Sequence, residues 1–139
     1  MTDDILLNKA QIIRRSLGRV EEEYQGKPEH LKNLTRQDAI VLNVQRACEA
    51  AIDLAMHAVA EAKLGLPQTS RDAFEMLAAH GVIDHELARH LQAMVGFRNV
   101  AVHNYQALDL KILQAIIEHR VEDLKTFADV LFRSDHTQR

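Results

Sequence analysis

The residues of this sequence whose types and spacing could carry a reaction lie together in the stretch RNVAVHNY. Arg98 is followed directly by Asn99, with His103 and Tyr105 further along. A histidine can take up or give away a proton near neutral pH, and an arginine guanidinium offers planar, permanently charged donors to phosphate oxygens. Residues 100–102 between them are apolar and would pack. The stretch therefore combines residues suited to proton transfer and phosphate binding with residues suited to a core.

Composition predicts an all-α fold around this stretch. Hydrophobic residues make up 47% of the 139, aromatic residues only 4%, and five glycines and two prolines leave few places to turn. Apolar residues recur with the helical period, and no internal repeat is present. We expect one domain over residues 1–139, an up-and-down bundle of four long helices plus a short one. The expected helices cover residues 3–24, about 36–64, 71–80, about 85–103 and about 110–131, followed by a frayed tail at about 133–139.

Helix ends are marked by side chains that can accept unpaired backbone amides. Thr35, Asp84 and Asp109 are predicted to cap the second, fourth and last helices, and Gly81 to stop the third. On a regular helix Arg98 and Tyr105 would lie within about 20° of each other, whereas His103 would be offset from Arg98 by about 140°. We therefore expect either that the helix loosens near residues 102–104, or that the site is a cleft approached from two sides.

Other candidate sites are weak. His85 and His90 are five residues apart rather than the four that place two zinc ligands on one helix face, so both are interpreted as solvated polar residues. The lone Cys48 lies in an Ala-rich run and is expected to be a buried core residue, so no metal site is predicted. Asp53 and His57 stand at i and i+4 and could pair, which would be ordinary helix electrostatics unless they face Arg98.

Charge and hydropathy restrict the class of protein further. The formal net charge of −3 argues against a generally basic nucleic-acid binder, although it leaves room for a local phosphate site. The acidic start MTDDILLNKA and the shortness of its apolar run predict neither a signal peptide nor a membrane helix. A cytoplasmic protein is expected.

The longer string is specific where an Arg–His pair alone is not. Arg98-Asn99-Val100-Ala101-Val102-His103-Asn104-Tyr105 resembles the R-x4-H-x-Y signature of the HEPN superfamily, and most of all its HepT-type ribonuclease toxins, which are encoded beside a minimal nucleotidyltransferase (MNT) antitoxin. The resemblance extends over nearly the whole chain and implies a metal-independent endoribonuclease without cofactors. It implies RNA, with tRNA as the expected target, and an MNT-type antitoxin as partners.

The resemblance also implies roles for the site residues. Arg98 and His103 would be catalytic, binding the scissile phosphate and transferring protons, with Asn99 supporting them. Tyr105 would contact RNA, or be the place where the antitoxin attaches AMP and so fills the RNA site beside Arg98. Because one chain holds a single Arg–His pair, a two-fold homodimer is expected to bring two pairs to one cleft.

Two alternatives stay open at this point. The apolar face of the fourth helix would form the dimer interface, or would instead be buried inside one monomer; its residues are Met94, Val95, Phe97 and Val100. The protein could also be a non-catalytic nucleotide- or substrate-binding partner of a nucleotidyltransferase, with the same Arg and His gripping phosphates. A purely structural bundle is a third reading, disfavoured by the polar cluster.

Overall fold

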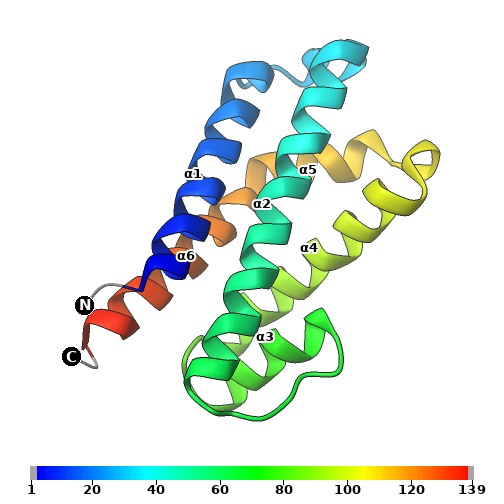
Figure 1. Ribbon diagram of the computed structural model, residues 1–139. Helices are drawn as coiled ribbons and strands as arrows, with labels where there is room; N and C mark the ends of the chain where they lie inside the picture. Colours follow the sequence, from blue (N-terminus) through cyan, green and yellow to red (C-terminus); the bar gives the residue numbers. More distant parts are fainter. Residues whose placement is uncertain (1–2, 138–139) are drawn as a thin grey trace.

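The computed structural model describes residues 3–137, and all regular secondary structure in this range is helical (Figure 1). The all-α fold class is thereby confirmed. Six α-helices and two short 3-10 helices follow one another along the chain. They are α1 (Asp4–Tyr24), η1 (Pro28–Lys32), α2 (Leu34–Glu61), α3 (Ser70–Ala79), α4 (His85–His103), η2 (Tyr105–Ala107), α5 (Leu110–His119) and α6 (Val121–Thr137).

The long helix α2 is the centre of the bundle. It runs antiparallel to α1 and also packs against α3, α4 and α6 (Figure 1). Ala47, Ala51 and Ala55 on α2 are buried, and their small side chains let the neighbouring helices approach closely. Phe74 of α3 and Phe127 of α6 meet edge to face in the core, with ring centroids 5.4 Å apart. The bundle thus holds α2 and the start of α4 on one common core.

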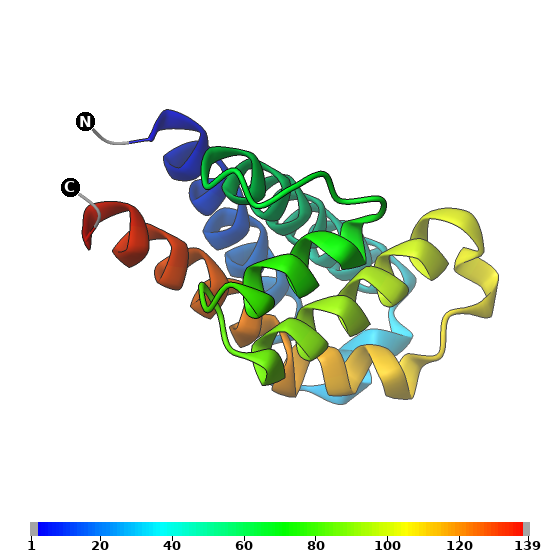
Figure 2. The same cartoon turned by 90° about the horizontal axis from the view of Figure 1, so that it is seen from below.

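The end of α4 leaves this core. Figure 2 shows the segment between α4 and α5 projecting from the body of the bundle. No residue of η2 is buried, whereas α4 buries seven residues between Leu87 and Ala101. The predicted functional stretch therefore starts in the core and ends on the surface.

The single last helix predicted from the sequence is wrong. The chain bends at Arg120, between α5 and α6, although no proline or glycine marks the bend. The apolar positions of both helices fall into one continuous helical pattern, so periodicity does not reveal the break. Glu122 and Asp123 lie in the first turn of α6, where acidic side chains favour a new helix N-terminus. The helix then runs to Thr137, so residues 133–137 of the expected frayed tail are helical; residues 138 and 139 lie outside the described part.

Most of the predicted helix ends are correct. Asp84 Oδ1 accepts a hydrogen bond from the backbone N–H of Leu87 at the start of α4. Asp109 Oδ1 accepts one from the backbone N–H of Lys111 at the start of α5. Gly81 follows α3 with a φ of +75°, as a helix stop requires. The cap of α2, however, is Asn33 and not Thr35.

Replacing each of the two candidate caps of α2 by alanine tests this correction. Asn33 Oδ1 accepts the backbone N–H of Arg36 at 3.0 Å, while Thr35 lies exposed inside the first turn. Asn33→Ala should lower the free energy of unfolding by about 1 kcal/mol, and Thr35→Ala should change it by less than about 0.5 kcal/mol. Denaturant unfolding followed by circular dichroism measures both. Equal losses in the two variants would contradict the assignment.

Within residues 3–137, none of the helices combines the length and hydropathy needed to cross a membrane.

Candidate functional site

Helix α4 positions the predicted site residues and stays regular through His103. Its buried stripe, which includes Leu91 and Met94, fixes the helix on the core. Near its end the N–H of Asn104 still bonds the carbonyl of Val100 at 2.8 Å, and Asn104 then leaves the helix with φ −154° and ψ 63°. The helix therefore ends within the range 102–104 that one predicted alternative gave, but only after His103, too late to turn this side chain toward the face of Arg98.

Arg98 is a partly buried cation without a partner. Its Nε is buried and has no hydrogen-bond partner, and none of the described residues forms an ion pair with it. The guanidinium lies close enough to the buried Cys48 to act on that thiol electrostatically. A buried donor that stays unsatisfied costs free energy, and a phosphate oxygen would satisfy it. This environment makes Arg98 a candidate for binding an anion such as a phosphate.

His103 is exposed at the tip of the helix and lies on a different face from Arg98. Five residues of regular α-helix separate the two side chains by about 140° and about 7.5 Å along the axis. The side chain of His103 has no hydrogen-bond partner among the described residues. The side-chain amide of the half-buried Asn99 has none either. Because the regular helix directs the two side chains to different faces, the arrangement fits the predicted alternative of a cleft approached from two sides.

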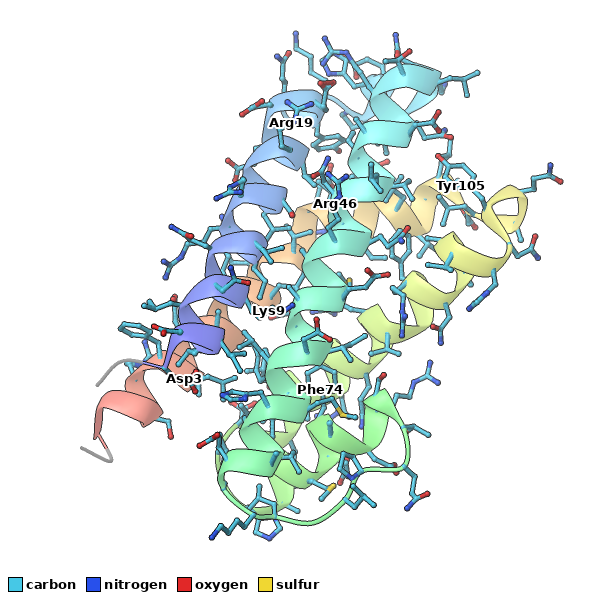
Figure 3. All side chains as sticks on the ribbon, viewed as in Figure 1. Asp3, Lys9, Arg19, Arg46, Phe74 and Tyr105 are labelled. Atoms are coloured by element: carbon cyan, nitrogen blue, oxygen red, sulfur yellow. The ribbon has the colours of Figure 1, made fainter. Side chains whose placement is uncertain are left out.

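Tyr105 lies past the end of α4, in η2, and its side chain reaches the first turns of α2. Its hydroxyl donates a hydrogen bond to Asp38 Oδ1 at 2.6 Å and lies 3.3 Å from Gln37 Oε1, both on the first turns of α2. Figure 3 shows Tyr105 between this part of α2 and the segment that follows α4. Partial burial and the Asp38 carboxylate raise the pKa of Tyr105 to about 12. Because α4 ends at His103, Tyr105 does not continue one regular helix with Arg98 as predicted, although both side chains lie toward α2.

Asp38 and Gln37 were not among the residues predicted from the sequence. Asp38 is 67 residues away from Tyr105 along the chain, and the sequence marked it only as the acidic residue three positions after the expected cap Thr35, not as a site residue. A helix with the right period was predicted there, but nothing local indicated which of its faces meets the end of α4. No sequence signal would have found this contact.

The apolar face predicted as a dimer interface is largely internal. Met94, Val95 and Phe97 are only 2%, 4% and 6% exposed within one chain, so for these three the alternative of burial in the monomer is correct. Val100 alone of the four is exposed, and Val102 beside His103 is exposed as well. The apolar surface available near the site is therefore at the very end of α4.

Asp53 and His57 do not pair with each other. Asp53 forms an ion pair with Lys9 at 2.9 Å, and His57 Nε2 lies 2.5 Å from Asp3 Oδ2. Both interactions tie α2 to the N-terminal part of α1. The two residues stabilise the packing of α1 on α2, and they do not face Arg98.

The remaining candidates are structural. Cys48 is buried, which raises the pKa of its thiol to about 12 and makes it a core residue as predicted. His85 is exposed, as predicted, but His90 is not simply solvated, because its Nδ1 lies 3.2 Å from Asp123 Oδ2 on α6. Over residues 3–137, no group of three or more His, Cys, Asp or Glu side chains is placed to hold a metal ion.

Comparison with known proteins gives a consistent result. A family model described as "Ribonuclease HepT-like" matches residues 13–131. An mRNA nuclease HepT from Shewanella oneidensis is 42% identical over 129 residues, which cover 93% of this chain and 97% of that protein. A tRNA nuclease HepT from Aphanizomenon flos-aquae is 27% identical over 106 residues, 76% of this chain and 72% of that protein.

Solved structures of similar proteins match this fold over nearly the whole chain. A tri-AMPylated Shewanella oneidensis HEPN toxin in complex with its MNT antitoxin superposes with a TM-score of 0.88 at 43% identity, covering 94% of this chain and 98% of that one. A toxin–antitoxin structure with AMP-PNP gives a TM-score of 0.86 at 39% identity, with the same coverage.

Proposed function

Because this chain belongs to the HepT-like ribonuclease family, we propose that it is the toxin of a toxin–antitoxin pair and acts as a metal-independent endoribonuclease in the cytoplasm. The observation that carries the proposal is the end of α4. There a half-buried arginine with an unsatisfied buried donor lies one and a half turns from an exposed histidine. The first is suited to a phosphate and the second to proton transfer.

The proposed reaction uses only groups of the protein and the RNA. The ribose 2′-oxygen attacks the neighbouring phosphorus, its proton goes to a base, and the departing 5′-oxygen takes a proton from an acid. A histidine can serve as either group near neutral pH. Arg98 would stabilise the negative charge that the phosphate oxygens gain in the transition state. The side-chain amide of Asn99 has no hydrogen-bond partner among the described residues, so it is free to orient the phosphate or His103.

A homodimer makes this assignment geometrically possible. In one chain the regular helix directs Arg98 and His103 about 140° apart. A two-fold axis near the end of α4 would bring Arg98 and His103 of two chains into one cleft, with one histidine as base and the other as acid. Val100 and Val102 are 39% and 44% exposed and would supply apolar contact there.

The experiment that tests the activity is incubation of the purified protein with total RNA in excess EDTA. We expect new RNA fragments, and sequencing of their ends distinguishes tRNA, the proposed target, from mRNA. Intact mass measured on the same sample shows whether Tyr105 is free of nucleotide. An unmodified dimer that leaves RNA intact, or that cleaves it only with added Mg²⁺, would overturn the proposal. RNA binding without cleavage would support the non-catalytic binding partner instead.

The proposed antitoxin is an MNT-type nucleotidyltransferase that attaches AMP to Tyr105. A similar toxin has been solved in its tri-AMPylated form with an MNT antitoxin. Tyr105 is 37% exposed on a projecting segment, so an enzyme can reach this side chain. Tyr24, the other of the two tyrosines, is buried and hydrogen-bonded to Glu118. Accessibility therefore favours Tyr105.

Tyr105→Phe should abolish the modification, because it removes the oxygen that forms the new bond. The variant is incubated with the partner nucleotidyltransferase and ATP, and intact mass is measured. We expect adenylyl adducts on the wild type and on Tyr24→Phe, the matched control, and none on Tyr105→Phe. An adduct of equal yield on Tyr105→Phe would place the modification elsewhere.

A further inference from the structure

The hydrogen bond between Tyr105 and Asp38 joins two parts of the molecule that otherwise meet little. No residue of η2 is buried, and the backbone hydrogen bonds of residues 104–109 stay within the segment or run to the adjoining helices α4 and α5. Among the described residues, only the contacts of the Tyr105 hydroxyl with Asp38 and Gln37 link this segment by hydrogen bonds to α2. Leu108 also packs, partly buried, against the core, so apolar packing at Leu108 and the hydrogen bonds of the Tyr105 phenol together hold the segment in place.

The hydrogen bond between Tyr105 and Asp38 is strong although it lies at the protein surface. The acceptor is a carboxylate, and hydrogen bonds to ionised acceptors are shorter and stronger than neutral ones, in agreement with the 2.6 Å separation. Partial burial, and then Asp38 itself, raise the pKa of Tyr105 to about 12, so the phenol remains a donor at neutral pH. His103 lies two residues before Tyr105, directly before the turn that this bond holds in place.

Adenylylation of Tyr105 is chemically incompatible with the contact. In the transfer, Tyr105 Oη forms a bond to the α-phosphorus of ATP, the bond from that phosphorus to the pyrophosphate oxygen breaks, and pyrophosphate leaves with the electron pair. The phenolic proton passes to its acceptor, Asp38, and then to water. The product has no donor left at Oη and carries a negative phosphodiester, which the negative carboxylate of Asp38 repels.

We propose that Asp38 is a positioning residue whose hydrogen bond to Tyr105 holds the segment next to His103, and that adenylylation of Tyr105 breaks this bond and releases the segment. The inference rests on the proposed function for its consequence, since a released segment would misplace His103 in the cleft. It differs from simple occlusion of the RNA site, because loss of the hydroxyl alone is enough to impair the enzyme.

Hydrogen exchange of the amides of residues 104–109 tests the contact without reference to activity. Loss of this bond should make exchange in the segment roughly fivefold faster in Asp38→Ala and in Tyr105→Phe. Asp38→Asn keeps an acceptor oxygen but loses the charge, so its exchange rate should lie between those of the wild type and Asp38→Ala. Glu61→Ala removes an exposed carboxylate from the other end of α2 and is the matched control. Wild type modified with ATP and the nucleotidyltransferase should exchange at least as fast as Tyr105→Phe.

RNA cleavage by the same variants tests the consequence. Asp38→Ala and Tyr105→Phe should each lower kcat roughly fivefold, with KM for RNA unchanged because Arg98 is untouched. The double variant should be no slower than either single variant, since both remove the same bond. Asp38→Asn should lose less of kcat than Asp38→Ala does, because it keeps a weaker, neutral acceptor.

The outcomes separate the two proposals. Unchanged exchange in Asp38→Ala, or in the modified protein, would overturn the positioning role even if RNA is cleaved as proposed. Faster exchange with unchanged kcat would show that the segment does not position His103. If the wild type cleaves no RNA, the proposed function fails, and the exchange rates still show whether Asp38 holds the segment and whether adenylylation releases it.

Discussion

His103→Ala is expected to lower kcat for RNA cleavage by about 10²- to 10⁴-fold, the range that a general acid or base contributes. The side chain is exposed and has no hydrogen-bond partner among the described residues, so its loss should leave the free energy of unfolding within about 0.5 kcal/mol of the wild type. The measurements are single-turnover cleavage in EDTA and denaturant unfolding. Expression of the variant without the antitoxin should no longer arrest growth.

His85→Ala is the matched control for this prediction. His85 is an exposed histidine on the same helix, at its first turn rather than its last, and its replacement should leave cleavage unchanged. In a mixed dimer with one wild-type chain, the His103→Ala chain leaves the shared cleft without either its acid or its base. The mixed dimer should therefore be nearly as slow as the variant homodimer. Half of the wild-type rate in the mixed dimer would show that each chain cleaves alone.

Arg98→Lys should lower kcat/KM for RNA by at least about tenfold, although the positive charge is kept. A lysine ammonium does not reproduce the planar, two-pronged contact of a guanidinium with phosphate oxygens, and Arg98→Ala should lose about 10²- to 10³-fold. The lysine variant also lacks the buried Nε–H that has no hydrogen-bond partner among residues 3–137. Its free energy of unfolding should therefore not fall, which separates a loss of activity from a loss of structure.

Arg89→Lys provides the comparison for Arg98→Lys. Arg89 is exposed on the same helix and forms no ion pair among the described residues, so the same chemical change there should leave cleavage intact. Cleavage at the wild-type rate by Arg98→Lys would mean that only charge is needed at this position. A parallel loss in both variants would point to general attraction of RNA rather than a defined phosphate contact.

Much of the fold follows from local patterns in the chain. The apolar period and the sparse turn residues predicted the all-α bundle, and Asp84 and Asp109 were correctly identified as caps because a cap bonds amides within two or three residues. The bend at Arg120 was missed because no turn residue marks it and the apolar pattern continues across it. Burial of Met94, Val95 and Phe97 inside the monomer depends on which helices pack against α4, and periodicity alone leaves that open.

In the candidate site, too, local sequence determined some features and helix packing determined the others. The identity and spacing of Arg98, Asn99, His103 and Tyr105 belong to one short string, so the sequence alone was enough to single them out and to relate them to a ribonuclease family. Their directions were not in the string. The helix ends at Asn104, and this turns Tyr105 toward Asp38, 67 residues earlier. Contacts over such separations arise only when whole helices pack, because packing and not local preference selects which faces meet.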